Sequence, residues 1–121
     1  DPYLKRSGQG EPERIGAGAG PPLCAAPGFA YESARRLLRP GDLLCLMSDG
    51  VTEARSAAGE LYGAERVRRV LLGLDAACSA RDAAQALLAD VQAFTKGAEP
   101  ADDLTLLVLR WRGPAAAPAA S

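Results

Sequence analysis

An uninterrupted apolar run, Leu43–Met47, leads directly into the tripeptide Ser48-Asp49-Gly50 and constrains the fold more than any other feature. Successive side chains of a strand point to opposite faces, so five apolar residues in a row make both sides of the strand apolar. Such a run is typical of a central strand that is covered on each face. The sequence therefore predicts a sheet-containing domain, with Asp49 directly beyond the end of its central strand.

Four more strands are predicted from short stretches bounded by glycine, proline and polar residues. They cover residues 3–6, 13–15, 30–38 and 101–112. The first two are expected to form a hairpin around the sequence SGQG. The third is expected to join the central strand, residues 42–48, through the turn Pro40-Gly41. The last strand is apolar on both faces as far as Leu109.

Two amphipathic helices are predicted between the central strand and the last one, over residues 64–72 and 80–95. Ser79, with Asp82 three residues later, is typical of the N-cap of the second helix. The glycine-rich stretch 16–20 lacks both the following helix and the Lys-Ser/Thr pair of a phosphate-binding loop, so we expect a flexible connection. Residues 113–121 have no core-forming residue larger than alanine and predict a disordered tail.

The charge balance gives no electrostatic case for binding to nucleic acid or to a membrane surface, because 14 Lys and Arg residues face 15 Asp and Glu residues. No stretch approaches the roughly 18 apolar residues of a membrane span. Cys24, Cys45 and Cys78 are odd in number and share no C-x-x-C spacing, which is typical of free thiols in a reducing compartment. We therefore expect a cytoplasmic domain.

Histidine is absent from the sequence, which excludes Ser-His-Asp and Cys-His nucleophilic catalysis and every zinc site that contains histidine. Any chemistry in this chain must then come from carboxylates, hydroxyls, backbone groups and arginine. Oxygen ligands of this kind suit hard cations such as Mg²⁺ and Mn²⁺.

Three aspartates lie where two of the predicted strands end or begin. Asp49 follows the central strand, and Asp102 and Asp103 open the last one. If these strands are antiparallel neighbours, the carboxylates meet at one sheet edge, where a divalent cation would relieve their mutual repulsion. The alternative is ordinary turn chemistry, because Asp-Gly after a strand is a common turn and Asp-Asp before a strand is often a solvated loop or cap. The residues alone leave both interpretations open.

Two ordered motifs carry a resemblance to a known family. They are RPGDLLCLMSDGVTEARSAAGELYGAERV, residues 39–67, and ADDLTLLVLR, residues 101–110. Together they closely resemble the metal-dependent, type 2C, serine/threonine protein phosphatases. The nearer match is the bacterial branch typified by stage II sporulation protein E and the sigma-factor-regulating phosphatases. The resemblance runs from about Tyr3 to Arg110, nearly the whole chain.

The resemblance implies an α/β fold of the α+β type, a sandwich of two antiparallel sheets flanked by helices with a two-metal centre at one end. It identifies Asp49 and Asp102 as ligands of the same metal, and gives Asp103 a supporting role or contact with an additional, weaker metal. Thr52 and Glu53 match the family pattern and need be no more than structural. The mechanism that it implies uses two Mn²⁺ or Mg²⁺ ions to activate a water that attacks phosphorus.

The family carboxylate that bridges the two metals belongs to an earlier segment, which has no counterpart in this sequence. We therefore expect residues 1–112 to be the C-terminal portion of a phosphatase domain that needs its N-terminal portion as a partner, and to be inactive alone. The implied activity is that of a protein serine/threonine phosphatase acting on an anti-sigma-factor antagonist or a similar bacterial signalling protein. The alternative is a degenerate phosphatase fold that serves as a non-catalytic protein-interaction module.

Overall fold

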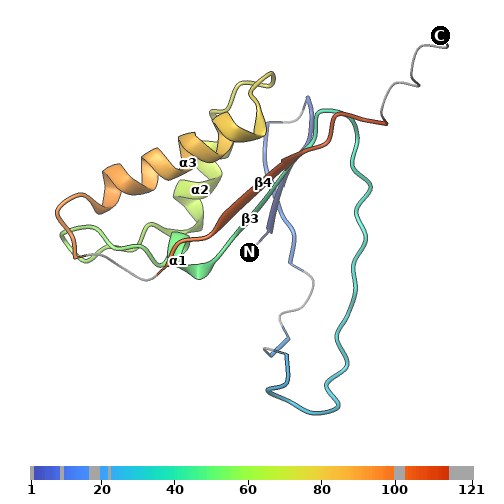
Figure 1. Ribbon diagram of the computed structural model, residues 1–121, viewed down its shortest axis with the longest axis horizontal. Helices are drawn as coiled ribbons and strands as arrows, with labels where there is room; N and C mark the ends of the chain where they lie inside the picture. The colour runs from blue at the N-terminus through green and yellow to red at the C-terminus, as the bar shows by residue number, and fades with distance from the viewer. Residues whose placement is uncertain (1, 9, 17–19, 22, 100–102, 115–121) are drawn as a thin grey trace, which may run out of the picture.

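The computed structural model describes residues 2–8, 10–16, 20–21, 23–99 and 103–114 (Figure 1). Along these residues the elements are β1 (Pro2–Lys5), β2 (Glu13–Arg14), β3 (Leu43–Met47), α1 (Asp49–Thr52), α2 (Gly63–Leu72), α3 (Ala80–Thr95) and β4 (Leu106–Arg110). The described strands form one antiparallel sheet in the order β2-β1-β3-β4, and α2 and α3 pack against one of its faces. The chain is thus a mixed α/β structure, as the sequence predicted.

The central position of β3 follows from its pairing on both sides. Its residues pair with β1 on one side and with β4 on the other, both antiparallel. In the second pairing Leu43 lies opposite Arg110, and Met47 lies opposite Leu106. The last residue of β3 is therefore level with the first residue of β4, as the sequence argument about the aspartates required.

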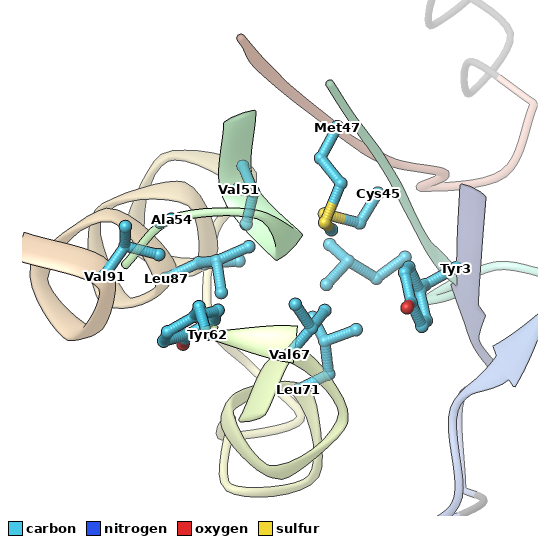
Figure 2. Packing of buried hydrophobic residues seen from close by; sticks show 12 residues of the cluster. Tyr3, Cys45, Met47, Val51, Ala54, Tyr62, Val67, Leu71, Leu87 and Val91 are labelled. Carbon is cyan, nitrogen blue, oxygen red and sulfur yellow. The ribbon is translucent and has the colours of Figure 1, made fainter. Parts of the chain in front are cut away.

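The core lies between β3 and the two long helices. Leu43, Cys45 and Met47 alternate along β3 and belong to one cluster of buried apolar side chains with residues of α1, α2 and α3. Figure 2 shows Cys45 and Met47 within this cluster. Each large aliphatic side chain buried in this way contributes about 1.5–3 kcal/mol of transfer free energy. This single cluster fixes the helices against the strand, because both long helices bury the apolar face that their sequence periodicity predicted.

The opposite face of the sheet is covered only in part by the described residues. Leu4 on β1 is fully buried there, whereas Leu46 on β3 is 38% exposed and Leu107 and Leu109 on β4 are 58% and 44% exposed. The apolar run of β3 therefore has one face in the core, and its other face is partly open. The prediction that the strand is covered on each side holds, within the described residues, for one side.

Helix α3 begins as the sequence predicted. The Ser79 hydroxyl accepts a hydrogen bond from the Asp82 backbone N–H at 3.0 Å, which satisfies one of the unpaired donors of the first turn. In the part of the chain that the structure describes, no helix combines the length and the apolar composition needed to cross a bilayer.

The strand predicted over residues 30–38 is wrong, because residues 30–39 form no regular structure. Tyr31 and Leu37 are largely exposed, and no described strand pairs with this stretch, so its backbone has no ladder to join. The last strand is also shorter than predicted, since β4 covers only Leu106–Arg110. Residues 115–121 of the predicted tail lie outside the described residues, and the hairpin of β1 and β2 is confirmed.

The turn before β3 is organised by Asp42, whose side chain is 1% exposed. Its carboxylate accepts hydrogen bonds from the backbone N–H groups of Ser7 and Arg39, both at 2.8 Å, and from the Arg6 guanidinium at 2.9 Å. Burial alone would raise the pKa of Asp42, but these three donors outweigh it and hold the pKa below its usual value. The buried charge is thus compensated from three directions.

Two cations close the same end of the sheet. Lys5 donates hydrogen bonds to the backbone carbonyls of Leu71 and Leu74 at 2.6 and 3.0 Å, where α2 ends. Arg110 donates to the carbonyls of Gly41 and Ala76 at 3.1 and 3.0 Å. The acceptors Leu71, at the end of α2, and Leu74 and Ala76, beyond it, are thereby tied to β1 and β4.

Candidate metal centre

Two of the three predicted site residues, Asp49 and Asp103, lie at the other end of the sheet, where β3 stops and β4 starts. Asp49 lies two residues beyond Met47, and Asp103 lies three residues before Leu106. Figure 1 shows α1, which begins with Asp49, beside the segment that enters β4. The predicted meeting of these two chain segments at one sheet edge is therefore present.

Gly50 brings the two segments into direct contact. A Cβ atom built on Gly50 would lie 3.2 Å from the carbonyl carbon of Asp103 and 3.4 Å from the Cα of Leu104, and the carbonyl oxygen of Asp103 would be nearer still. Only a residue without a side chain leaves room for this approach. Gly50 therefore accommodates the backbone of Asp103 beside the start of α1.

Asp49 is held by a short helix rather than by a simple glycine turn. Helix α1 starts at Asp49, and its Val51 side chain is 1% exposed within the core cluster. The Glu53 backbone N–H donates to the Asp49 carbonyl at 2.8 Å and closes the turn. The backbone that carries the Asp49 carboxylate is thus anchored from both sides, by β3 before it and by the Val51 side chain after it.

Ser48 joins the two segments by two hydrogen bonds. Its backbone N–H donates to the Thr105 carbonyl at 3.0 Å, and its hydroxyl accepts from the Thr105 backbone N–H at 2.9 Å. Ser48 was not among the residues predicted for the site. A serine directly after a strand and before a helical turn predicts an N-cap, but the Ser48 hydroxyl makes no capping bond to α1.

Both described carboxylates are exposed, and within the described residues neither Asp49 nor Asp103 pairs with a cation or accepts a hydrogen bond through its side chain. Free carboxylate oxygens at one sheet edge are the kind of ligands that Mg²⁺ and Mn²⁺ prefer. Asp102 lies outside the described residues, and the described residues contain no group of three potential ligands. The two described carboxylates are suitable ligands for such a cation, but they are too few to form a complete coordination shell.

Cys45, which could be mistaken for a nucleophile, lies in the core. It is 1% exposed, and burial raises the pKa of its thiol to about 11. A thiol with this pKa is almost entirely protonated at neutral pH and is a poor nucleophile. Cys45 is therefore a structural residue of the core.

Comparison with known proteins gave a family and several solved structures. A sequence model of the stage II sporulation protein E (SpoIIE) family matches residues 1–112. The PP2C phosphatase domain with a fragment of the regulatory domain of the cell fate determinant SpoIIE from Bacillus subtilis is similar, with 27% identity, a TM-score of 0.72, and coverage of 90% of this chain and 30% of that one. No curated protein matched.

Two further structures share the fold. The phosphatase domain of SpoIIE from Bacillus subtilis, described as Mn presoaked, has 24% identity and a TM-score of 0.68, covering 96% of this chain and 48% of that one. The SiaA-PP2C domain of Pseudomonas aeruginosa has 22% identity and a TM-score of 0.71, covering 91% of this chain and 42% of that one. The chain therefore spans less than half the length of each of the three structures compared.

Proposed function

The chain belongs to the stage II sporulation protein E family, and from this premise we propose that it forms the C-terminal portion of a metal-dependent protein serine/threonine phosphatase domain. The observation that carries the proposal is the sheet edge at which Gly50 packs against the main chain of Asp103. Residues that the sequence resemblance assigns to the metal centre come from two segments more than 50 residues apart, and the fold brings these segments together there. In this proposal residues 1–112 belong to the domain.

In this proposal Asp49 and Asp102 hold one Mn²⁺ or Mg²⁺ ion, and Asp103 supports that ion or contacts a further, weaker one. When bound, the metal centre supplies a water of lowered pKa and neutralises the oxygens of the phosphoryl group. The contribution of this chain is to hold the ligands. Asp49 is fixed by α1, and the backbone at Asp103 is fixed by its contact with Gly50.

The rest of the domain would complete both the site and the fold. The open part of the sheet face, formed by Leu46, Leu107 and Leu109, is an apolar surface of the kind that a second sheet covers in a β-sandwich. The chain spans 30–48% of the length of the compared structures. The remaining part of a domain of that length is long enough to supply a second sheet and further metal ligands. We therefore expect residues 1–121 alone to show no phosphatase turnover.

The substrate class follows from the sequence resemblance to the sigma-factor-regulating branch. We propose a phosphorylated anti-sigma-factor antagonist, or a similar bacterial signalling protein, in the cytoplasm. The balanced charge of the chain supports a protein substrate over nucleic acid.

The test is the Mn²⁺-dependent hydrolysis of an aryl phosphate by the full-length protein and its variants. Asp49→Asn should abolish turnover because it removes the charge of one metal ligand. It should change the melting temperature little, because the side chain is exposed. Asp82→Asn is the matched control, since it removes the same charge from an exposed position on α3 and should leave turnover unchanged. Asp49→Asn with near wild-type turnover would remove Asp49 from the site. Absence of turnover in the wild type would favour the non-catalytic interaction module.

A further inference from the structure

The ladder of backbone hydrogen bonds between β3 and the segment entering β4 changes at Ser48, the first residue beyond β3. The register that pairs Met47 with Leu106 makes Ser48 and Thr105 the next pair of the antiparallel ladder. In a regular hydrogen-bonded pair, each residue donates its N–H to the carbonyl of the other. The Ser48 N–H does so, donating to the Thr105 carbonyl at 3.0 Å.

The second bond of the pair is made differently. The Ser48 carbonyl accepts instead from the Val51 backbone N–H at 3.1 Å, which is the bond that opens the helical turn α1. The Thr105 N–H is left without its ladder partner, and the Ser48 hydroxyl takes the place of the carbonyl at 2.9 Å. The side chain thus keeps the ladder closed while the backbone of the same residue leaves it.

This use of the hydroxyl differs from the usual role of serine at a helix start. Ser48 has the extended conformation of an N-cap, with φ −74° and ψ 163°, but its side chain makes no capping bond to the helix. Ser79 has nearly the same backbone conformation, with φ −74° and ψ 165°, and its hydroxyl does cap α3. Two serines with the same backbone conformation therefore accept different hydrogen bonds. The Ser79 hydroxyl accepts from its own helix, and the Ser48 hydroxyl accepts from the segment that enters β4.

We propose that Ser48 is a positioning residue for the metal centre, acting through the Thr105 backbone to hold the segment that carries Asp103 at a fixed place relative to Asp49. This inference rests on the proposed function. The bridge lies one residue before Asp49 and two residues after Asp103, so a change in it moves one carboxylate relative to the other. Residues that orient metal ligands without touching the metal typically affect metal affinity by about 10–100-fold.

The experiment uses the full-length protein and three variants, Ser48→Ala, Ser48→Thr and Ser79→Ala. Mn²⁺ affinity is measured by calorimetry, and exchange of the Thr105 backbone amide is measured in the metal-free protein by hydrogen–deuterium exchange resolved to that residue. Ser48→Ala should weaken Mn²⁺ binding by about tenfold or more and should accelerate exchange at Thr105. Ser48→Thr retains a hydroxyl and should restore both.

Ser79→Ala is the control for a merely structural effect. It removes the same kind of bond, from a backbone N–H to a serine hydroxyl, at a helix start far along the chain from the site. It should lower the melting temperature comparably and leave Mn²⁺ affinity at the wild-type value. Equal losses of affinity in Ser48→Ala and Ser79→Ala would overturn the positioning role, as would wild-type affinity in Ser48→Ala.

The outcomes separate this inference from the proposed function. A wild-type protein that binds no Mn²⁺ would overturn the proposed function and, with it, a role of Ser48 towards a metal. Exchange at Thr105 in the metal-free protein reports on the bridge itself. Unchanged exchange in Ser48→Ala would overturn the inference even if the wild type is an active phosphatase.

Discussion

Replacing Gly50 by alanine tests the closest contact of the site with a change of one methyl group. The new Cβ would lie 3.2 Å from the Asp103 carbonyl carbon, and the carbonyl oxygen would be nearer still. Carbon atoms in contact are most stable at about 3.5–4.0 Å, so the carbonyl group has to withdraw by an amount on the order of 1 Å. Overpacking of this kind costs about 1–3 kcal/mol of folding free energy.

The effect on the site should exceed the effect on stability. A displacement of about 1 Å in a catalytic group can cost roughly 100-fold in rate. We therefore expect Gly50→Ala in the full-length protein to lower Mn²⁺-dependent turnover of an aryl phosphate by about 100-fold, with a fall of a few degrees in the melting temperature. Turnover and thermal unfolding are measured on the same preparations, so that loss of folded protein is not counted as loss of activity.

Gly73→Ala is the matched control. Gly73 has φ −79°, and a Cβ there would meet backbone oxygens of α2 only at 3.6 and 3.7 Å, which is ordinary contact. Its turnover should equal that of the wild type. Full turnover in Gly50→Ala would refute the reasoning, because the approach of Asp103 to Gly50 would then have no bearing on the site.

Three further predictions concern the rest of the chain. Asp42→Ala should destabilise the protein by about 2–4 kcal/mol because it leaves buried donors unpaired. The stability that Asp42 contributes should be fully present above its usual carboxyl pKa of 3.8 and be lost as the pH falls through its lower folded-state pKa, as urea unfolding at several pH values would test. Alkylating reagents should leave Cys45 unmodified in the native full-length protein, and mass spectrometry showing rapid native-state labelling would contradict its burial. Leu107→Asp should impair folding of the full-length protein far more than Glu99→Gln, an exposed control, if the rest of the domain covers that face, and equal melting temperatures would argue against it.

The parts of the fold that the sequence predicted are those with a strong periodic pattern. The apolar run Leu43–Met47 and the helical spacing of residues 80–95 each have one interpretation that satisfies both burial and backbone hydrogen bonding. The helix has the predicted bounds, and the strand predicted over residues 42–48 is one residue shorter at each end. The strand prediction for residues 30–38 was wrong, because a stretch becomes a strand only if another strand is free to pair with it. Whether such a partner exists depends on tertiary structure, and local pattern does not contain that information.

Some features of the candidate site could likewise be predicted from the sequence and others could not. The position of Asp49 after the apolar run could be inferred from the sequence, whereas the antiparallel pairing of β3 with β4 was only a condition of the sequence argument and is shown by the structure. The role of Ser48 could not be inferred, because it depends on one carbonyl being diverted to α1 and on the neighbouring strand being in register. Contacts of this kind arise from three-dimensional geometry between segments far apart in sequence, and the separate segments carry no mark of them. Asp102 lies outside the described residues, so its assignment stays a prediction.

The two ends of the sheet are joined by β3 and use their charged side chains differently. Lys5 and Arg110 bind backbone carbonyls at one end, while at the other the carboxylates of Asp49 and Asp103 are exposed and have no ion-pair partner among the residues that the structure describes. Five residues of strand separate the ends by roughly 13–17 Å, which exceeds both the Debye length of about 8 Å at physiological ionic strength and the range of about 7–10 Å within which mutations usually interact. The end with Asp49 and Asp103 can therefore be re-engineered, while the bonds of Lys5 and Arg110 at the other end serve as an internal reference for the integrity of the scaffold.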